Sequence, residues 1–416
     1  MFVVFKKEYI NNLWVLLPFI LVYTGSVFSN MNASISSALK ISAFIYMLLF
    51  VIIKKKANRN LFIATLLFLP ILIYDIYYSF YWKAGISDGI RYLFPIITLF
   101  YGYSIRDKMP LLIKFIAFFV VLNFFVQIVN YVNWLRGVDQ WFYYTSYTGY
   151  RYYNMTAGIL RATGIVVFFG FYGFLNLIAF FILRRYYFGK YRKIILGMAF
   201  FSFIASISYK AFMAFALILV FYFYKQIFKI GTYLLILLIG VYLYAPQIIN
   251  KFINDIVIRI QLYIIGGHTV RTESYKVLWR NIIHGNWFGE GVGSFGGPAS
   301  TTYNSPYYEQ IGFNFNDFQS AWLRLPTTDT YLPHLVVELG IVGSILYLLV
   351  LIMPLLRKKI PAIVLIIYAT LFFDMLFSFS LNNLEYLLFS FVFIYPIYKY
   401  ETSLKKQYKT QTNDYQ

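Results

Sequence analysis

Apolar stretches of membrane-spanning length recur from one end of this 416-residue chain to the other. A spanning helix needs about 20 predominantly apolar residues, and inside a bilayer a helix satisfies its own backbone polar groups. The sequence therefore predicts a chain of apolar helices rather than a water-soluble core. The candidate spans are 13–29, 35–53, 61–80, 92–105, 109–133, 156–183, 194–208, 211–224, 230–249, 331–353, 360–380 and 385–398.

Composition agrees with this interpretation. Hydrophobic residues make up 60% of the chain and charged residues only 12%, whereas a soluble domain carries about 25% charged residues. We expect an all-α polytopic membrane protein with about twelve transmembrane helices. The first apolar stretch lacks a small-residue cleavage site, so we expect it to be retained as a helix.

Basic residues gather in alternate links between the apolar segments. The formal net charge is +20, which in a soluble protein would indicate nucleic-acid binding. Here the cations concentrate at 54–59, 106–108, 184–193, 357–359 and 399–409. Since cytoplasmic loops carry the excess of Lys and Arg, both termini are predicted to be cytoplasmic, and no nucleic-acid partner is expected.

This alternation divides the chain into four parts. Residues 1–249 hold nine predicted helices, 250–330 form one large extracytoplasmic loop, 331–398 hold three more helices, and 399–416 form a cytoplasmic tail. Two shorter outer loops are expected at 81–91 and 134–155. Their aromatic residues fit an interfacial belt, and they also fit stacking platforms for sugar rings.

Residue types exclude several chemistries. The chain has no cysteine, which excludes disulfides, zinc thiolate sites and Cys nucleophiles. Its three histidines, His268, His284 and His334, match no zinc-ligand spacing, and the outer loops lack a clear Asp-x-Asp pair. We therefore expect no metal and no cofactor.

Four cations lie on the predicted outer side, three of them at or near the ends of apolar segments, where a charge is costly, and Arg271 in the central part of the large loop. They are Arg91, Arg161, Lys210 and Arg271. One interpretation is that each extends its head group to the membrane interface. The other interpretation is that together they form a pocket for a lipid-linked diphosphate. An Arg guanidinium can donate two parallel hydrogen bonds to phosphate oxygens, and a Lys ammonium adds a positive charge.

The segment 271–343 carries a recognisable pattern. Arg271 is followed by Trp279, by the turn Gly289-Glu-Gly291-Val-Gly293, by Thr328-Asp329, and by a helix that contains Glu338-Leu-Gly340. Upstream, Arg161-Ala-Thr-Gly164 and Ser208-Tyr-Lys210 complete the pattern. In this order the motifs resemble the bacterial O-antigen polymerase and ligase superfamily. Arg280 and Gly291 also match an Arg-x10-Gly spacing of some Wzy-type repeat-unit polymerases.

The resemblance implies a fold and an activity. The fold would be GT-C-like, and the enzyme would be a metal-independent glycosyltransferase of capsular or O-antigen polysaccharide synthesis. Donor and acceptor would both be polyprenyl-diphosphate-linked oligosaccharide repeat units, and a chain-length regulator protein is a possible partner. The ligases have a His-Asn pair where this chain has Thr328-Asp329, which favours the polymerases.

Residue roles follow from that chemistry. Arg161, Lys210 and Arg271, with Arg91 in reserve, would stabilise the departing diphosphate. Asp329 is the first candidate for the base that accepts the proton of the attacking hydroxyl, and it equally fits a helix N-cap. His334 is the second candidate base. His334 and Glu338 are four residues apart on one helical face, so they form either a seam directed at the site or a buried pair.

Two other functions fit the same pattern. A ligase would transfer a finished glycan to a different acceptor, using the same cationic pocket. A flippase would move lipid-linked units without changing their length. The large outer loop with its glycine-rich turn favours a polymerase over a flippase.

Overall fold

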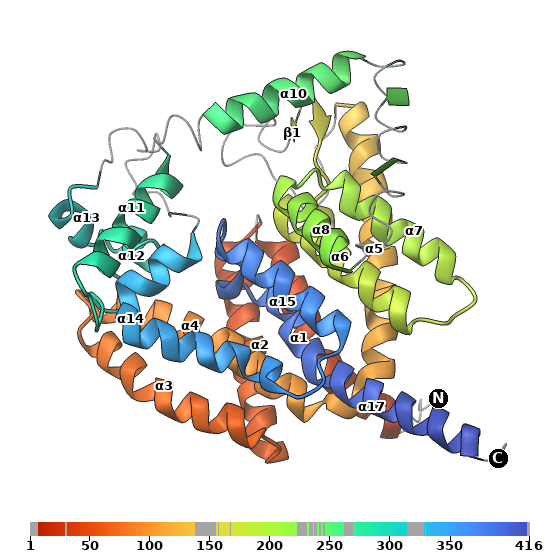
Figure 1. The fold of residues 1–416 in the computed structure, drawn as a ribbon, viewed down its shortest axis with the longest axis horizontal. Helices are drawn as coiled ribbons and strands as arrows, with labels where there is room; N and C mark the ends of the chain where they lie inside the picture. Colours follow the sequence, from red (N-terminus) through yellow and green to blue (C-terminus); the bar gives the residue numbers. More distant parts are fainter. Residues whose placement is uncertain are drawn as a thin grey trace.

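The computed structural model describes residues 7–29, 31–137, 155–156, 158–166, 168–222, 231–232, 236, 239–240, 243, 246–261, 269–313, 328 and 330–413. These residues fold almost entirely into helices, with one short hairpin of strands β1 (Met155–Thr156) and β2 (Ile159–Leu160). The longer helices are α1 (Lys7–Phe28), α2 (Ala33–Lys54), α3 (Arg59–Tyr77), α4 (Trp82–Ser104), α5 (Met109–Leu135), α6 (Phe169–Tyr186), α7 (Arg192–Ala205), α8 (Tyr209–Tyr222), α10 (Pro246–Ile260), α11 (Val270–Ile283), α14 (Tyr331–Ile352), α15 (Ala362–Met375) and α17 (Phe391–Asn413) (Figure 1). Short helices and 3-10 turns connect them: η1 (Arg106–Lys108), η3 (Gly164–Val166), α12 (Pro298–Thr302), α13 (Tyr307–Gln310), η6 (Met353–Leu356), η7 (Ser380–Asn382) and α16 (Leu384–Phe389).

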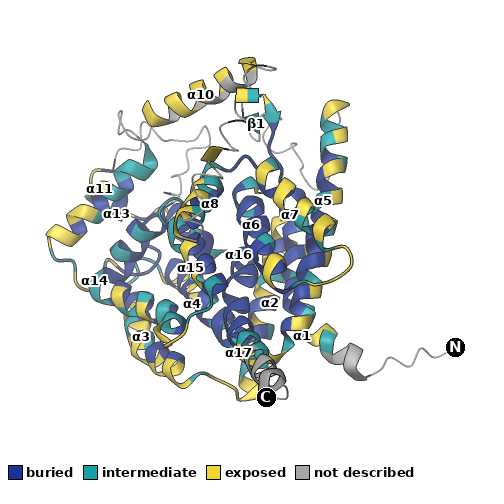
Figure 2. Ribbon diagram, turned by 45° about the vertical axis from the view of Figure 1, so that its right-hand side comes forward, coloured by how far each residue is buried: buried dark blue, intermediate teal, exposed yellow. Residues whose placement is uncertain are grey.

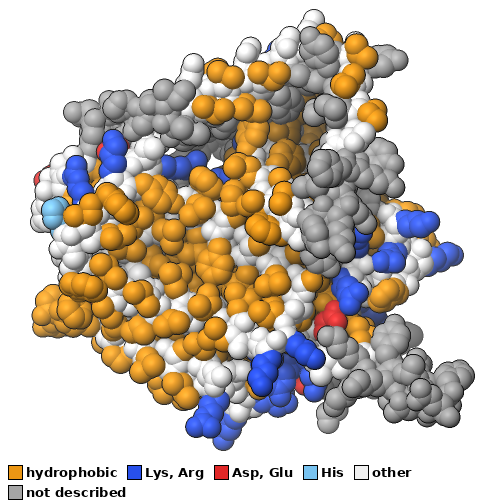
Figure 3. All heavy atoms as spheres, in the orientation of Figure 1, with side chains coloured by type: hydrophobic (Ala, Val, Ile, Leu, Met, Phe, Trp, Pro, Cys, Tyr) orange, Lys and Arg blue, Asp and Glu red, His pale blue; other side chains and the backbone are white. Residues whose placement is uncertain are grey.

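Several of these helices suit a bilayer. Within the described residues, four are long and apolar enough to cross a membrane: α2, α3, α5 together with η1, and α14 together with η6. Shorter apolar helices accompany them at Asn12–Phe28, Tyr209–Phe221 and Ala362–Met375. Apolar side chains form a broad band on the outer surface (Figure 3). The expectation of an all-α membrane protein is confirmed.

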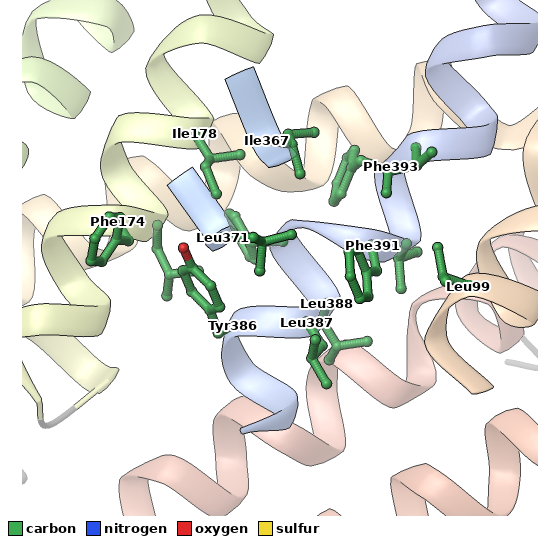
Figure 4. Packing of buried hydrophobic residues seen from close by; sticks show 14 of the residues in the cluster. Leu99, Phe174, Ile178, Ile367, Leu371, Tyr386, Leu387, Leu388, Phe391 and Phe393 are labelled. Carbon is green, nitrogen blue, oxygen red and sulfur yellow. The ribbon is translucent and has the colours of Figure 1, made fainter. Parts of the chain in front are cut away.

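The centre of the helical body is the segment 384–398, which forms α16 and the start of α17. Every residue in it is buried. Figure 4 shows Leu387, Leu388, Phe391 and Phe393 projecting toward side chains of the surrounding helices. Figure 2 shows the difference between the centre and the periphery: α6 and α16 are coloured as buried, whereas α3 and α5 are partly exposed. Burial of large apolar side chains, worth about 1.5–3 kcal/mol each, therefore holds the other helices around this segment.

Helix α4 corrects one prediction. The sequence suggested an outer loop at 81–91 and a short span that Arg91 opens, but the helix begins at Trp82 and runs 23 residues. Its first turns are polar because they face a protein interior: Asp88 is fully buried and pairs with Arg91 three residues on. Buried charges that pair in this way belong to helices as readily as to loops.

The predicted span 156–183 is a second correction. Its first third is the β hairpin followed by η3, and α6 begins only at Phe169. Gly164 has φ +52°, a backbone region that glycine adopts without steric cost and that ends a right-handed helix. Arg161 consequently lies in the turn before η3 and not inside a helix.

The large polar region also has internal structure. Within the predicted extracytoplasmic loop 250–330, the described part contains most of α10 and all of α11, α12 and α13. Half of the predicted span 230–249 lies outside the described residues. Helix α17 crosses the predicted boundary at 399 without a break and ends at Asn413.

Candidate functional site

Lys210 and Arg271 lie around the end of α15. Lys210 lies in the first turn of α8. Its ammonium group donates a hydrogen bond to the carbonyl oxygen of Phe377 over 2.5 Å. Lys210 and Arg271 both interact electrostatically with the carboxylate of Asp374 in the last turn of α15. Two cations 61 positions apart in sequence therefore converge on one carboxylate.

Tyr275 ties helix α11 to the same place. Its hydroxyl donates to the carbonyl oxygen of Leu376 over 2.7 Å. Burial raises the pKa of Tyr275, and the nearby Arg271 guanidinium offsets part of that rise; the net pKa is about 12. The hydroxyl therefore keeps its proton at neutral pH. This hydrogen bond holds the helix that carries Arg271 against the segment that carries Asp374.

Arg161 joins this group through the turn between α7 and α8. Its guanidinium donates to the carbonyl oxygen of Ile207 over 2.8 Å and to that of Ser206 over 3.4 Å. It also stacks 3.1 Å from the ring centre of Phe169. Carbonyls at a helix end carry partial negative charge, which favours a cation here. Because this turn leads directly into Lys210, the Arg161 guanidinium is bound three residues before Lys210.

We call Arg161, Lys210, Arg271 and Asp374 the cationic centre. The Asp374 carboxylate is buried and accepts a 2.5 Å hydrogen bond from Ser378. Lys210 and Arg271 against the Asp374 carboxylate leave an excess of one positive charge, and the Arg161 guanidinium on the Ile207 carbonyl adds a second. A group of fixed cations with this excess is suited to an anion such as a phosphate ester.

A second feature is the contact between the glycine-rich loop and α14, which we call the glycine clasp (residues 286–293 and 337–342). Helix α14 is broken at Gly340, where φ is 65° and ψ is −176°. The loop fits into this break. Glu290 N–H donates to the carbonyl of Val337 over 2.8 Å, and Ile341 N–H donates to that of Asn286 over 3.0 Å.

Each glycine of the motif contacts a different backbone. A Cβ at Gly289 would overlap the Glu338 carbonyl and the Gly340 nitrogen of α14. A Cβ at Gly291 would lie 2.8 Å from the Tyr78 carbonyl oxygen, and one at Gly293 would lie 2.8 Å from the Ala84 carbonyl carbon. The glycine-rich turn therefore holds the polar region against the ends of α3, α4 and α14.

Behind the clasp lies a cluster of four buried residues, Asp88, Tyr92, His334 and Glu338, with the partly exposed Arg91 at its edge. We call these five residues the acid–histidine cluster. Arg91 contacts an Asp88 oxygen over 2.8 Å, and Tyr92 donates to a Glu338 oxygen over 3.0 Å. His334 Nδ1 lies 2.7 Å from the Phe295 carbonyl oxygen and 3.4 Å from Glu338. Asp88, His334 and Glu338 are completely buried.

Two atoms of this cluster are unsatisfied. The Phe295 carbonyl can only accept, so His334 carries its proton on Nδ1. His334 Nε2 and the second oxygen of Asp88 have no hydrogen-bond partner among the described residues. Asp88, His334 and Glu338 each offer one ligand atom, and these atoms lie within 4.8 Å of one another. They are the residues that best fit a cation, although the Arg91 guanidinium on Asp88 opposes a divalent one.

The predicted site residues thus fall into separate places. Arg91 lies in the same cluster as His334 and Glu338. Its 2.8 Å contact is with Asp88 and not with a residue of the cationic centre. Phe379 packs edge-on against His334 with ring centres 5.2 Å apart, and it directly follows the segment 374–378.

Arg280 is on α11 and donates to the Ile311 carbonyl over 3.3 Å. Asp329 lies outside the described residues, beside the fully buried Thr328.

Sequence reasoning missed Asp88 and gave Asp374 no role. The available signal for Asp88 was its spacing of three residues from Arg91, which fits a helical ion pair. The expectation of a site without metal or cofactor stays a prediction. The chain matches no protein-family model, and no curated protein or solved structure shows significant similarity to it.

Proposed function

We propose that the protein is a polysaccharide polymerase that joins polyprenyl-diphosphate-linked oligosaccharide repeat units at the outer face of a bacterial cytoplasmic membrane. The observation that carries this proposal is the position of Lys210 and Arg271 around Asp374, with the guanidinium of Arg161 bound to the turn that precedes α8. These residues come from four distant parts of the sequence. An excess of fixed positive charge at one place is what a departing diphosphate requires.

The reaction is a displacement at the anomeric carbon of the donor sugar. The hydroxyl oxygen of the acceptor unit forms the new glycosidic bond, and the bond between that carbon and the diphosphate oxygen breaks. The hydroxyl proton passes to a base, and the lipid diphosphate leaves as an anion. Fixed cations stabilise that anion without having to reorganise.

Asp329 is our candidate for the base, because it lies directly before the helix whose first turns carry His334. His334 and Glu338 are better suited to positioning. Both are fully buried, and both bind the backbone of Phe295 behind the clasp: His334 Nδ1 donates to its carbonyl, and Glu338 accepts from its N–H over 3.2 Å. We infer that they hold the polar region in register with α14.

The proposed topology has about twelve spans and a GT-C-like arrangement. Both chain ends lie in the cytoplasm, and the cationic centre lies at the outer leaflet with the large polar region. This orientation rests on the basic links between helices, which favour the cytoplasmic side.

The test starts from a strain that lacks the gene. Its membranes should accumulate single repeat units on the lipid, and these extracted units are the substrate for the purified protein. We expect a ladder of longer glycans from these units alone. A transfer that needs a second, different acceptor would indicate a ligase, and vesicles that move the unit without lengthening it would indicate a flippase.

Variants connect the activity with the cationic centre. Arg161→Ala and Arg271→Ala should each abolish the ladder, and Arg271→Lys should restore it only in part, because an ammonium cannot form two parallel bonds to a phosphate. Lys276→Ala is the matched control: it lies on the same helix, is largely exposed and pairs with Glu273 over 2.6 Å. Long chains from both Arg→Ala variants would refute the diphosphate pocket.

A further inference from the structure

A cavity of about 530 Å³ opens between α1, α2 and η1, at the end of the helices that carries the basic links. Its walls come from the start of α1, the last turns of α2 and the turn between α4 and α5. None of its lining residues belongs to the cationic centre or to the acid–histidine cluster. The proposed polymerase gives it no role.

One half of this cavity is basic. Lys54, Lys56 and Lys108 line it, with Asp107 as the opposing charge. Lys108 donates to the Asn12 side-chain oxygen over 3.3 Å, which directs its ammonium toward α1. Three lysines against one aspartate leave two more positive than negative charges. Figure 3 shows Lys and Arg side chains grouped along the lower edge of the molecule, below the apolar band.

The other half is apolar and aromatic. Trp14 and Tyr46 stack with ring centres 6.3 Å apart and planes 10° apart, and the Tyr46 hydroxyl donates to the Trp14 carbonyl over 2.8 Å. Leu49 and Ile53 continue this wall along α2. Ile53 is 75% exposed and Trp14 51% exposed. On a helix of membrane-spanning length, such side chains face acyl chains.

We propose that this cavity binds one anionic phospholipid of the cytoplasmic leaflet. The phosphate lies among Lys54, Lys56 and Lys108, and the first part of an acyl chain lies against Trp14, Leu49 and Ile53. A phospholipid is the occupant that uses both halves, because a free anion would leave the aromatic wall without a partner. Basic pockets between membrane helices on the cytoplasmic side suit anionic head groups.

The expected affinity follows from the charges. Each juxtamembrane lysine near an anionic lipid contributes about fivefold to binding, so replacing all three should weaken retention roughly 100-fold. The measurement is native mass spectrometry of the purified protein after incubation with vesicles of phosphatidylglycerol or phosphatidylcholine. We expect one retained phosphatidylglycerol and no retained phosphatidylcholine.

The variant is Lys54→Gln/Lys56→Gln/Lys108→Gln, which keeps most of each side-chain stem and removes the charge. Lys55→Gln is the matched control, since Lys55 lies between two lining lysines but does not line the cavity. It should retain the lipid. If the triple variant does not fold, Lys108→Gln alone should lose about fivefold.

Three results would overturn the proposal. One is equal retention of phosphatidylcholine and phosphatidylglycerol by the unaltered protein. Another is a loss in Lys55→Gln as large as that in the triple variant. The third is displacement of the lipid by inorganic phosphate at the same concentration, which would show that the cavity binds a free anion. Because the readout is lipid retention, it is independent of glycan synthesis.

Discussion

Replacing Gly340 by alanine should disrupt the glycine clasp. Gly340 has φ 65° and ψ −176° inside α14, a conformation open essentially to glycine, and another residue placed there costs about 1–3 kcal/mol. The added Cβ would also overlap the Gly289 nitrogen and the Trp287 carbonyl oxygen. The loop must therefore move away from the helix.

That movement breaks hydrogen bonds. Ile341 N–H donates to Asn286 over 3.0 Å, and Val342 N–H donates to Trp287 over 3.2 Å. Each contributes about 1 kcal/mol net. Together with the backbone strain, Gly340→Ala should lower the free energy of unfolding by roughly 3–5 kcal/mol, at the upper end of what single substitutions do.

The assay is equilibrium unfolding of the purified protein in micelles by a denaturing detergent, followed by tryptophan fluorescence. Gly197→Ala is the control. Gly197 lies inside α7, and a Cβ there would meet no atom within 4 Å, so this change should stabilise the protein by about 0.5–1 kcal/mol. A Gly340→Ala protein that unfolds at the same detergent fraction as the unaltered protein would refute the reasoning.

Two further predictions concern buried polar pairs. Asp88→Ala removes the carboxylate that the partly exposed Arg91 guanidinium contacts over 2.8 Å. Because water can solvate part of that guanidinium, the change should cost about 1–3 kcal/mol, measured by the same unfolding assay, and a cost below about 0.5 kcal/mol would contradict a stabilising role for this pair. Tyr331→Phe leaves the Tyr347 hydroxyl without its 2.9 Å partner and should cost about 1–3 kcal/mol. Adding Tyr347→Phe should recover part of that loss, and a fully additive double variant would show that the two hydroxyls are not coupled.

The helical, membrane-embedded character of the chain was predictable because it depends on segment length and composition. Boundaries were less predictable where polar residues enter a helix. Asp88 and Arg91 made the start of α4 resemble a loop, but they pair with each other across one helical turn, and Asp88 is buried. The reverse occurred at Arg161, where apolar neighbours suggested a helix and Gly164 ended it.

The site was predictable only in part, for the same reason. The spacing of His334 and Glu338 indicated that they share a helical face, and the structure places them 3.4 Å apart. The role of Asp374 could not be inferred, because its neighbours Lys210 and Arg271 are distant in sequence. The three glycines of the 289–293 turn were visible as a motif, but the backbones that they touch belong to three separate helices.

The most completely packed segment, 384–398, is synthesised after fourteen of the labelled α-helices. Until it leaves the ribosome, the helices that it will cover expose their inner surfaces to lipid or to the insertion machinery. Assembly is therefore expected to wait for this segment, however early the preceding helices enter the membrane. A chain interrupted before Leu384 should be inserted but unassembled, and it should be an early substrate for membrane proteases.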